Sequence, residues 1–223
     1  MKHYPTAVAF DVVETLFALD PVQERLTGAG LPPGILPFWF AAFLRDALAM
    51  DAAGTYAPFE DVAEGSLHVV MLSHGVEPTK KRIASVIDAF AELPAHPDVA
   101  PAFEKLRVAS VRVAMLTNGS AKTTKRLLER AGLEKLVSET ISIDEVKRWK
   151  PAREVYLHTA KKLDVNPAKL ALVAAHGWDI HGAKEAGLIA GFVARKEKAP
   201  SPTMAQPDVQ DASLVEVVER LLG

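Results

Sequence analysis

The chain has 223 residues, a formal net charge of −2 at pH 7, and a composition that is 49% hydrophobic and 24% charged. These values are typical of a globular protein with a full core, and they leave no basic surface of the kind that binds nucleic acid. The absence of cysteine excludes disulfides, thiolate metal sites and a cysteine nucleophile.

The apolar runs of the sequence are too short to cross a membrane. A membrane-spanning helix needs about 20 consecutive apolar residues. The N-terminal stretch MKHYPTAVAF has one lysine but neither a long apolar run nor a small-residue cleavage site, so we expect no signal peptide. We therefore expect a cytoplasmic protein with no membrane partner.

Short β-rich apolar runs alternate with helical patterns along most of the chain. The first run, residues 7–13, is followed over 17–95 by a series of amphipathic helical patterns with no convincing strand. Later apolar runs predict strands at 111–116, 138–143, 170–175 and 189–194. Helical patterns lie between and after these runs, at 120–131, 152–163, 180–186 and 214–222.

This alternation predicts an α/β fold with a Rossmann-like, doubly wound and mainly parallel sheet. Residues 17–95 interrupt the alternation, and the segment LPAHPDV at 93–99 is typical of a linker back into it. We expect a core domain of residues 1–16 and 96–223, with residues 17–95 inserted as an all-helical cap. Residues 196–208 are predicted to form a polar loop before the last helix.

Polar residues follow four of the predicted strands. They are Asp11 and Thr15, then Thr117 and Asn118, then Lys150, and finally His176, Trp178 and Asp179. Each has an ordinary structural explanation on its own, since a strand-end aspartate commonly caps a turn and Asn-Gly commonly forms one. In a doubly wound sheet, however, the carboxyl ends of the strands meet at the edge where such folds bind ligands. We therefore expect these side chains to form one site.

Four motifs give the chain a resemblance to the haloacid dehalogenase superfamily over essentially its whole length. They are FDxxxTL at 10–16, LTNG at 116–119, Lys150-Pro151 followed by Tyr156, and WDIHGAKEAG at 178–187. The resemblance implies that Asp11 is a nucleophile and that Lys150 pairs with it and with the negative charge of the substrate. It also implies that the small-residue loop after the second strand holds substrate oxygens. Because this fold hosts several reactions, the chemistry depends on the branch.

Two positions separate the chain from the magnesium-dependent phosphatases of that superfamily. Those enzymes resemble one another in a general acid two residues after the nucleophile, where this chain has Val13. They also share a magnesium-binding aspartate at the position of Ala175. Neither of these apolar side chains transfers a proton or binds a magnesium ion. We therefore expect no metal and no other cofactor.

The chain is more similar to the type II, or L-, 2-haloacid dehalogenases, which need no metal. In that branch the nucleophile forms an ester with the carbon that carries the halogen, and water then hydrolyses the ester. The resemblance implies the catalytic residues Asp11, Thr15, Lys150 and Asp179, and we add His176 as a further catalytic candidate. It implies substrate contacts from Val12, Thr117, Asn118, Trp39, Tyr56, Phe59, Tyr156 and Trp178, and we expect Phe40 to lie with them. A short haloacid or related carboxylate as substrate, and a homodimer, are the partners we expect.

Two features depart from that branch. It carries an arginine directly after the cap tryptophan to hold the leaving halide, whereas this chain has Phe40, and Arg45 is more than one helical turn further on. A serine and an asparagine of its last loop are replaced by Ala175 and His176. We expect Asn118 and the aromatic edges to stabilise the halide. His176 either activates the hydrolytic water or replaces the asparagine in packing.

Three functions therefore stay open at this stage. The first is a dehalogenase-type hydrolase of a small 2-haloacid, and the second is a metal-independent hydrolase of another small carboxylate or ester through the same Asp11 intermediate. The third is a non-catalytic binding protein. The joint presence of Asp11, Lys150 and Asp179 counts against the third, because a binding protein does not need all three.

Overall fold

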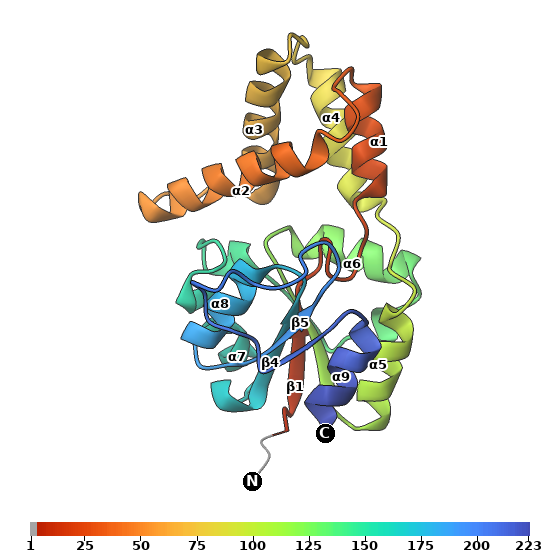
Figure 1. The fold of residues 1–223 in the computed structure, drawn as a ribbon, viewed down its shortest axis with the longest axis vertical. Helices are drawn as coiled ribbons and strands as arrows, with labels where there is room; N and C mark the ends of the chain where they lie inside the picture. Colours follow the sequence, from red (N-terminus) through yellow and green to blue (C-terminus); the bar gives the residue numbers. More distant parts are fainter. Residues whose placement is uncertain (1–3) are drawn as a thin grey trace. The chain divides into compact units, whose positions relative to one another are not determined.

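The computed structural model describes residues 4–223, which form two compact units (Figure 1). Unit 1 comprises the chain up to Phe17 together with Ala95–Gly223, and unit 2 is Ala18–Pro94. Each unit has its own packed interior.

Unit 1 is built around a six-stranded parallel sheet in the order β3-β2-β1-β4-β5-β6. The strands are β1 (Ala7–Phe10), β2 (Arg112–Thr117), β3 (Glu139–Ser142), β4 (Leu170–Ala174), β5 (Ile189–Val193) and β6 (Val209–Asp211). The chain runs outward from β1 to β3 and then returns to place β4 on the other side of β1. The predicted α/β class with a doubly wound parallel sheet is confirmed.

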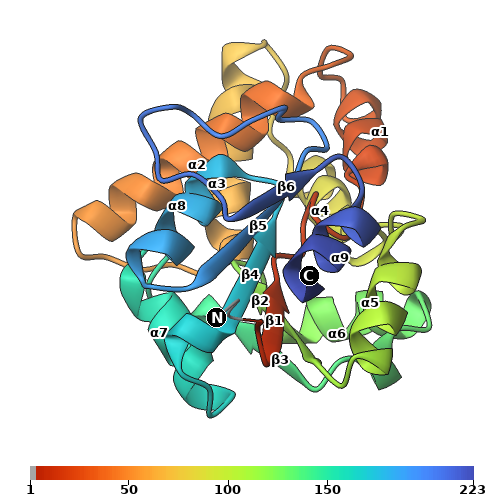
Figure 2. The same cartoon turned by 60° about the horizontal axis from the view of Figure 1, so that its bottom comes forward.

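Helices cover both faces of this sheet. They are α5 (Val99–Val108), α6 (Ala121–Arg130), α7 (Arg153–Lys162), α8 (Gly177–Glu185) and α9 (Leu214–Leu222), with 3₁₀ turns at Glu134–Leu136, Ile143–Glu145 and Pro167–Lys169. Figures 1 and 2 show α7 packed beside α8 on one face, and α5 beside α9 on the other. Because both faces are covered, every residue of β1 and β4 is buried, which explains their uninterrupted apolar sequences.

The first strand is shorter than predicted. We expected a strand over 7–13, but β1 ends at Phe10. The backbone then turns, because the carbonyl of Val12 accepts hydrogen bonds from the N–H groups of Leu16 and Phe17 at 3.0 and 3.2 Å. Glu14 lies in the left-handed region with φ 64°. Val12 and Val13 continue the apolar pattern past the end of β1, so the pattern did not show where the turn that carries Asp11 begins.

Two elements of the structure were not predicted from the sequence. Helix α5 was missed, and strand β6 lies directly after the expected polar loop 196–208, whereas α1 lies within residues 17–95, where helices were expected. This edge strand has three residues, none of them buried, so it carries no apolar run that a sequence pattern detects. Helix α8 also begins three residues before the predicted start at 180.

Unit 2 is entirely helical among its described residues. It contains α1 (Asp20–Gly28), α2 (Leu36–Ala52), α3 (Phe59–Ser73), α4 (Lys80–Asp88) and a 3₁₀ turn at Ala89–Ala91. Aromatic rings join these helices, since Phe59 lies 4.8 Å from Phe43 and 5.0 Å from Phe90 between ring centroids. Within residues 4–223, none of the helices combines the length and the apolarity needed to cross a membrane.

Helices α7 and α8 approach each other closely at Gly182. A Cβ atom at this position would lie 2.5 Å from the hydroxyl oxygen of Tyr156 and 2.6 Å from Cβ of Pro151. Glycine is therefore required here for packing. This contact determines how near the Tyr156 side chain comes to the first turn of α8.

We predict that Gly182→Ala lowers the free energy of unfolding by about 1–3 kcal/mol, because the added methyl overpacks a rigid contact. Gly65→Ala is the matched control, since Gly65 is also helical and a Cβ there meets nothing within 4 Å. The control should be neutral or stabilising by up to about 1 kcal/mol. Thermal unfolding followed by circular dichroism compares the two, and equal melting temperatures would contradict the packing argument.

Candidate active site

The site lies where the strand order of the sheet reverses. Strands β1 and β4 are neighbours, and the chain leaves them toward opposite ends of the sheet. Asp11 directly follows β1, and the segment from Ala175 to Asp179 follows β4. Open α/β sheets bind their ligands at the carboxyl ends of the strands around such a reversal. The topology alone therefore brings Asp11 and Asp179 to a binding position.

Lys150 lies between two carboxylates. Its Nζ atom is 2.9 Å from Oδ1 of Asp11 and 2.6 Å from Oδ2 of Asp179. The side chains of Lys150 and Asp179 are completely buried, while that of Asp11 keeps 8% of its surface exposed. A buried ammonium is stable only when it is paired and hydrogen-bonded, and two carboxylates meet that requirement here. Of these three groups, Asp11 is the one that solvent reaches.

The electrostatics keep Lys150 charged. Burial alone would lower its pKa, but the charges of Asp11 and Asp179 outweigh burial, and the pKa of Lys150 rises above its ordinary value. Tyr156 donates a hydrogen bond to Oδ1 of Asp179 at 2.6 Å. Burial and the charge of Asp179 raise the pKa of Tyr156 well above its ordinary value, so its hydroxyl stays a donor. Both carboxylate oxygens of Asp179 therefore accept a hydrogen bond, Oδ2 from Lys150 and Oδ1 from Tyr156.

Thr15 connects the loop after β1 to the loop after β4. Its hydroxyl donates to Oδ2 of Asp11 at 2.7 Å and accepts from the N–H of Ala175 at 2.9 Å. Asp11 therefore has both oxygens held, one by Thr15 and one by Lys150. A carboxylate oriented in this way can act as a nucleophile or as a base.

The other core residues predicted for the site lie around these groups. Asn118 is buried, and its Oδ1 accepts the backbone N–H of Lys150 at 3.3 Å. The hydroxyl of Thr117 accepts the N–H of Gly119 at 2.9 Å, which shapes the turn after β2. Val12 is buried and contributes its carbonyl to the turn after β1. The structure thus gives Thr117 and Val12 a structural part, and their contact with a substrate stays a prediction.

His176 forms an ion-pair network of its own at the start of α8. Its Nε2 lies 3.3 Å from Oε2 of Glu14, and its Nδ1 lies 3.3 Å from Oε1 of Glu197. The ring stacks on Trp178 with centroids 5.5 Å apart and planes 13° apart. Burial would lower the pKa of His176, but the carboxylates of Glu14, Glu197 and Asp11 raise it to about 10. The imidazole is therefore charged at neutral pH.

The predicted substrate wall residues belong to unit 2. Trp39 is buried in that unit, where its indole N–H donates to the hydroxyl of Ser66 at 3.0 Å. Phe59 is also buried, and Phe40 lies 5.8 Å from Phe43 between ring centroids. Tyr56 precedes α3 and is partly exposed. Substrate contacts from Trp39, Phe40, Tyr56 and Phe59 stay predictions.

Arg45 engages a neighbour within unit 2. Its guanidinium pairs with Asp46 at 2.8 Å, and 67% of its side chain is exposed. The structure thus gives Arg45 an acidic partner on the surface of unit 2. This pairing is consistent with our expectation that Arg45 does not replace the arginine missing at position 40.

No group of three or more His, Asp and Glu side chains within residues 4–223 is arranged to hold a metal ion. The position between Asp11 and Asp179 is taken by the ammonium of Lys150. Val13 and Ala175, on the two loops that meet at Thr15, add no oxygen ligand from a side chain.

Sequence reasoning missed Glu14, Lys196 and Glu197. Glu14 was passed over because it lies in a motif position read as variable, and the other two lie in a segment read as a polar loop. The available signal was the run Arg195-Lys196-Glu197-Lys198, four charged residues that begin two positions after the last residue of β5. A charged run is usually a solvated surface, so the pattern alone did not indicate a site.

Comparisons with known proteins agree with this geometry. A family model described as haloacid dehalogenase-like hydrolase matches residues 5–187. The chain is 30% identical over 218 residues to (S)-2-haloacid dehalogenase 1 of Pseudomonas sp. (strain CBS-3), covering 97% of this chain and 96% of that protein. It is also 30% identical over 191 residues to (S)-2-haloacid dehalogenase of Xanthobacter autotrophicus, covering 85% and 75% of the two chains.

Solved structures give the same relationship. The L-2-haloacid dehalogenase from Xanthobacter autotrophicus with chloropropionic acid covalently bound is similar with a TM-score of 0.88 and 25% identity. The match covers 98% of this chain and 99% of that one. The similarity therefore extends over both units and includes the segments that carry Asp11, Lys150 and Asp179.

We predict that Lys150→Met lowers the free energy of unfolding by about 3–5 kcal/mol at pH 7, because it leaves Asp11 and Asp179 buried without their shared cation. Burial already raises the pKa of Asp179 above its ordinary value, and loss of the Lys150 charge raises it further. Such a group destabilises the folded state once pH rises past the unfolded pKa, so the loss should shrink as pH falls from 7 toward 4. Urea unfolding at several pH values measures both effects.

Lys162→Met is the matched control for this prediction. Lys162 also pairs with two carboxylates, those of Glu145 at 2.9 Å and Glu139 at 3.6 Å, but its side chain is 32% exposed. Its removal should cost no more than about 1 kcal/mol. Equal losses in the free energy of unfolding for Lys150→Met and Lys162→Met would show that burial does not increase the cost of removing Lys150.

Proposed function

Since the chain belongs to the haloacid dehalogenase-like hydrolases, we propose that it is a 2-haloacid dehalogenase that uses Asp11 as its nucleophile. The observation that carries this proposal is the carboxylate of Asp11, which Thr15 and buried Lys150 hold at 2.7 and 2.9 Å. The named relatives are dehalogenases of (S)-2-haloacids, so a small (S)-2-haloacid is the substrate we propose.

The first step is a substitution at the carbon that carries the halogen. A carboxylate oxygen of Asp11 forms a bond to C2 of the substrate while the carbon–halogen bond breaks and the halide leaves with the electron pair. No proton is needed for the halide to leave, which is consistent with Val13 in place of a general acid. Lys150 pairs with Asp11, and its charge also attracts the anionic substrate.

The second step is hydrolysis of the ester. Water adds to the carboxyl carbon of Asp11, and the bond between that carbon and the oxygen attached to C2 breaks. The products are a 2-hydroxy acid, a regenerated Asp11 carboxylate and a proton. Asp179 and Tyr156 orient Lys150 and its charge through both steps, while Thr15 holds the remaining oxygen of Asp11.

A metal-independent mechanism follows from the same contacts. The cation that lies between the carboxylates of Asp11 and Asp179 is the ammonium of Lys150, at 2.9 and 2.6 Å. A divalent cation at that position would have to displace it against strong repulsion. We therefore propose that the chain's own lysine supplies the positive charge that the reaction needs.

We propose further that unit 2 acts as a cap that closes over the substrate with Trp39, Phe40, Tyr56 and Phe59. Asn118 and the aromatic edges would stabilise the departing halide, because position 40 offers no charge. The protein would work as a homodimer in the cytoplasm. Phe40 also supports the second candidate, hydrolysis of another small carboxylate or ester through Asp11, since such a reaction needs no halide-binding arginine.

We predict that the protein releases halide from chloroacetate and from (S)-2-chloropropionate but not from the (R) enantiomer, and that excess EDTA leaves the rate unchanged. Asp11→Asn should reduce the rate by roughly 10³-fold or more, because it removes the nucleophile. Asp144→Asn is the control, since Asp144 is an exposed carboxylate of the same unit. Halide release and chiral analysis of the hydroxy acid provide the readouts.

Loss of activity with EDTA, restored by Mg²⁺, would contradict the metal-independent mechanism. Absence of halide release combined with Asp11-dependent hydrolysis of small esters would favour the second candidate. Normal turnover by Asp11→Asn would contradict both, because both depend on the same intermediate.

A further inference from the structure

Four charged side chains form a closed ring next to the site, which we call the loop clasp and define as Glu14, His176, Lys196 and Glu197. Lys196 Nζ lies 2.7 Å from Oε1 of Glu14, and the other oxygen of Glu14 lies 3.3 Å from Nε2 of His176. Nδ1 of His176 faces Glu197 at 3.3 Å. Lys196 and Glu197 are neighbours in the chain, which closes the ring.

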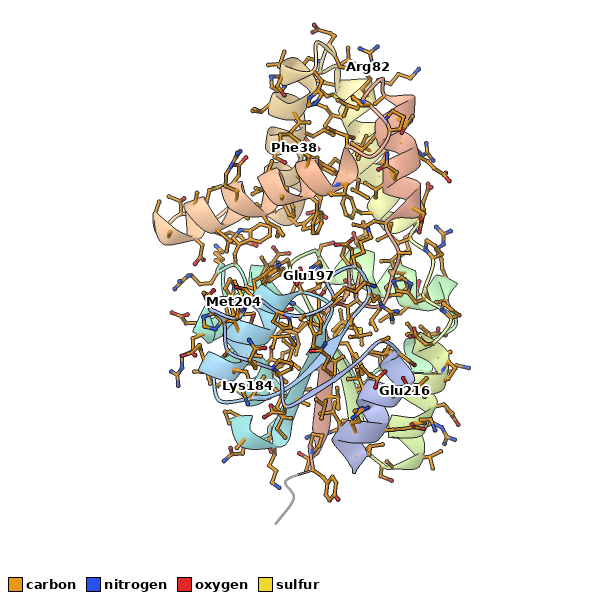
Figure 3. All side chains as sticks on the ribbon, viewed as in Figure 1. Phe38, Arg82, Lys184, Glu197, Met204 and Glu216 are labelled. Atoms are coloured by element: carbon orange, nitrogen blue, oxygen red, sulfur yellow. The ribbon has the colours of Figure 1, made fainter. Side chains whose placement is uncertain are left out.

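The loop clasp joins three loops that leave the sheet at its carboxyl edge. Glu14 belongs to the turn after β1, three residues after Asp11. His176 belongs to the loop after β4, three residues before Asp179. Lys196 and Glu197 belong to the segment after β5, where Figure 3 marks Glu197. The ring therefore fixes the two catalytic carboxylates through the loops that carry them.

Glu197 makes the tightest of these connections to α8. Its Oε2 accepts the N–H of Gly177, the first residue of that helix, at 2.9 Å. Gly177 has no room for a side chain, since a Cβ there would lie 3.0 Å from Pro200. Glu197 thus caps the helix whose first turn contains Asp179, and Pro200 holds the segment against it.

The same segment is held at a second point. Arg195 donates from Nε to the carbonyl of Thr15 at 2.7 Å and pairs with Asp98 at 2.9 Å. Arg195 and Glu197 therefore contact the loops after β1 and β4 from opposite ends of one tripeptide. Within the loop clasp, the side chain of His176 is 11% exposed and that of Glu197 is 41% exposed, so His176 is the more buried of the two.

The positive charge of His176 forms the ion pairs with Glu14 and Glu197 in the loop clasp. The carboxylates of Glu14 and Glu197 lie beside its imidazole, and the charge of Asp11 also acts on it. Lys196 forms an ion pair with Glu14. The carboxylates raise the pKa of His176 to about 10, while the pKa values of Glu14 and Glu197 are lowered despite their burial, because His176 is charged. An imidazolium has no free lone pair, so His176 in this state cannot accept a proton from water.

We propose that Glu197 is a positioning residue of the Asp11 reaction, which acts by holding the imidazolium of His176 against Glu14 and thereby fixing the loops that present Asp11 and Asp179. His176 is then a cationic link between loops, not the base that activates water. The consequence for the rate rests on the proposed function, whereas the ion-pair ring can be tested without any substrate.

Glu197→Gln tests the proposal, because glutamine keeps the size and a hydrogen-bonding oxygen but removes the charge. The pKa of His176 should fall by at least about one unit toward its ordinary value of 6.5. Below that new pKa the imidazolium persists and Glu14 still binds it, so kcat at pH 6 should stay within about threefold of the parent protein. At pH 9 about half of the rings are neutral if the pKa falls by one unit, so kcat should fall by about twofold there, and further if the pKa falls further, since the neutral ring no longer holds the loops.

The titration of His176 is read by NMR of the imidazole ring, with the signal assigned by its loss in His176→Asn. Lys198→Gln is the control, because Lys198 lies in the same segment and its Nζ donates to the carbonyl of Arg195 at 3.4 Å and not to a member of the loop clasp. The control should leave both the His176 titration and the pH profile unchanged.

A His176 pKa near 6.5 in the parent protein, or one that Glu197→Gln does not move, would overturn the ion-pair ring whether or not the protein has dehalogenase activity. If the pKa moves as expected but kcat falls equally at every pH, Glu197 merely supports the fold and the positioning role is wrong. If instead the rate of the parent protein rises as His176 loses its proton, His176 is the general base and the proposal is wrong.

Discussion

The whole site depends on one buried cation, the ammonium of Lys150 between Asp11 and Asp179. Two carboxylates cannot share a dry interior without a positive charge between them. Every other feature supports this arrangement, since Tyr156 fills the remaining oxygen of Asp179 and Thr15 the remaining oxygen of Asp11. What stays partly open is the Asp11 carboxylate itself, which is the property that a nucleophile requires.

A second set of charges lies around the first and has a different purpose. The loop clasp contains two carboxylates and two cations, so it carries no net charge to offer a substrate. Its members link the loops after β1, β4 and β5, and the reversal of strand order brings these loops together. In the function we propose, the inner triad provides the chemistry, and the outer ring maintains the distances on which that chemistry depends.

Much of the fold was predictable because buried parallel strands leave uninterrupted apolar runs, as in residues 170–174 of β4. The inner site was predictable because Asp11, Lys150 and Asp179 follow strands whose ends must meet. The outer ring was not predictable, because the contact between Glu197 and His176 joins residues 21 positions apart across loops with no periodic pattern. Strand β6 escaped for a related reason, since a three-residue edge strand is defined by its neighbour and not by its own residues.

Oxygen-18 labelling tests whether Asp11 becomes covalently bonded to the substrate carbon, as we propose. A single turnover is run in oxygen-18 water with the protein in excess over a 2-haloacid, followed by mass spectrometry of the product and of the peptide that contains Asp11. We expect a hydroxy acid that is nearly unlabelled and an Asp11 carboxylate that has gained one heavy oxygen, because water attacks the ester at the Asp11 carboxyl carbon. Heavy oxygen in the product of the first turnover, with Asp11 unlabelled, would show that Asp11 only activates water and would contradict the covalent mechanism.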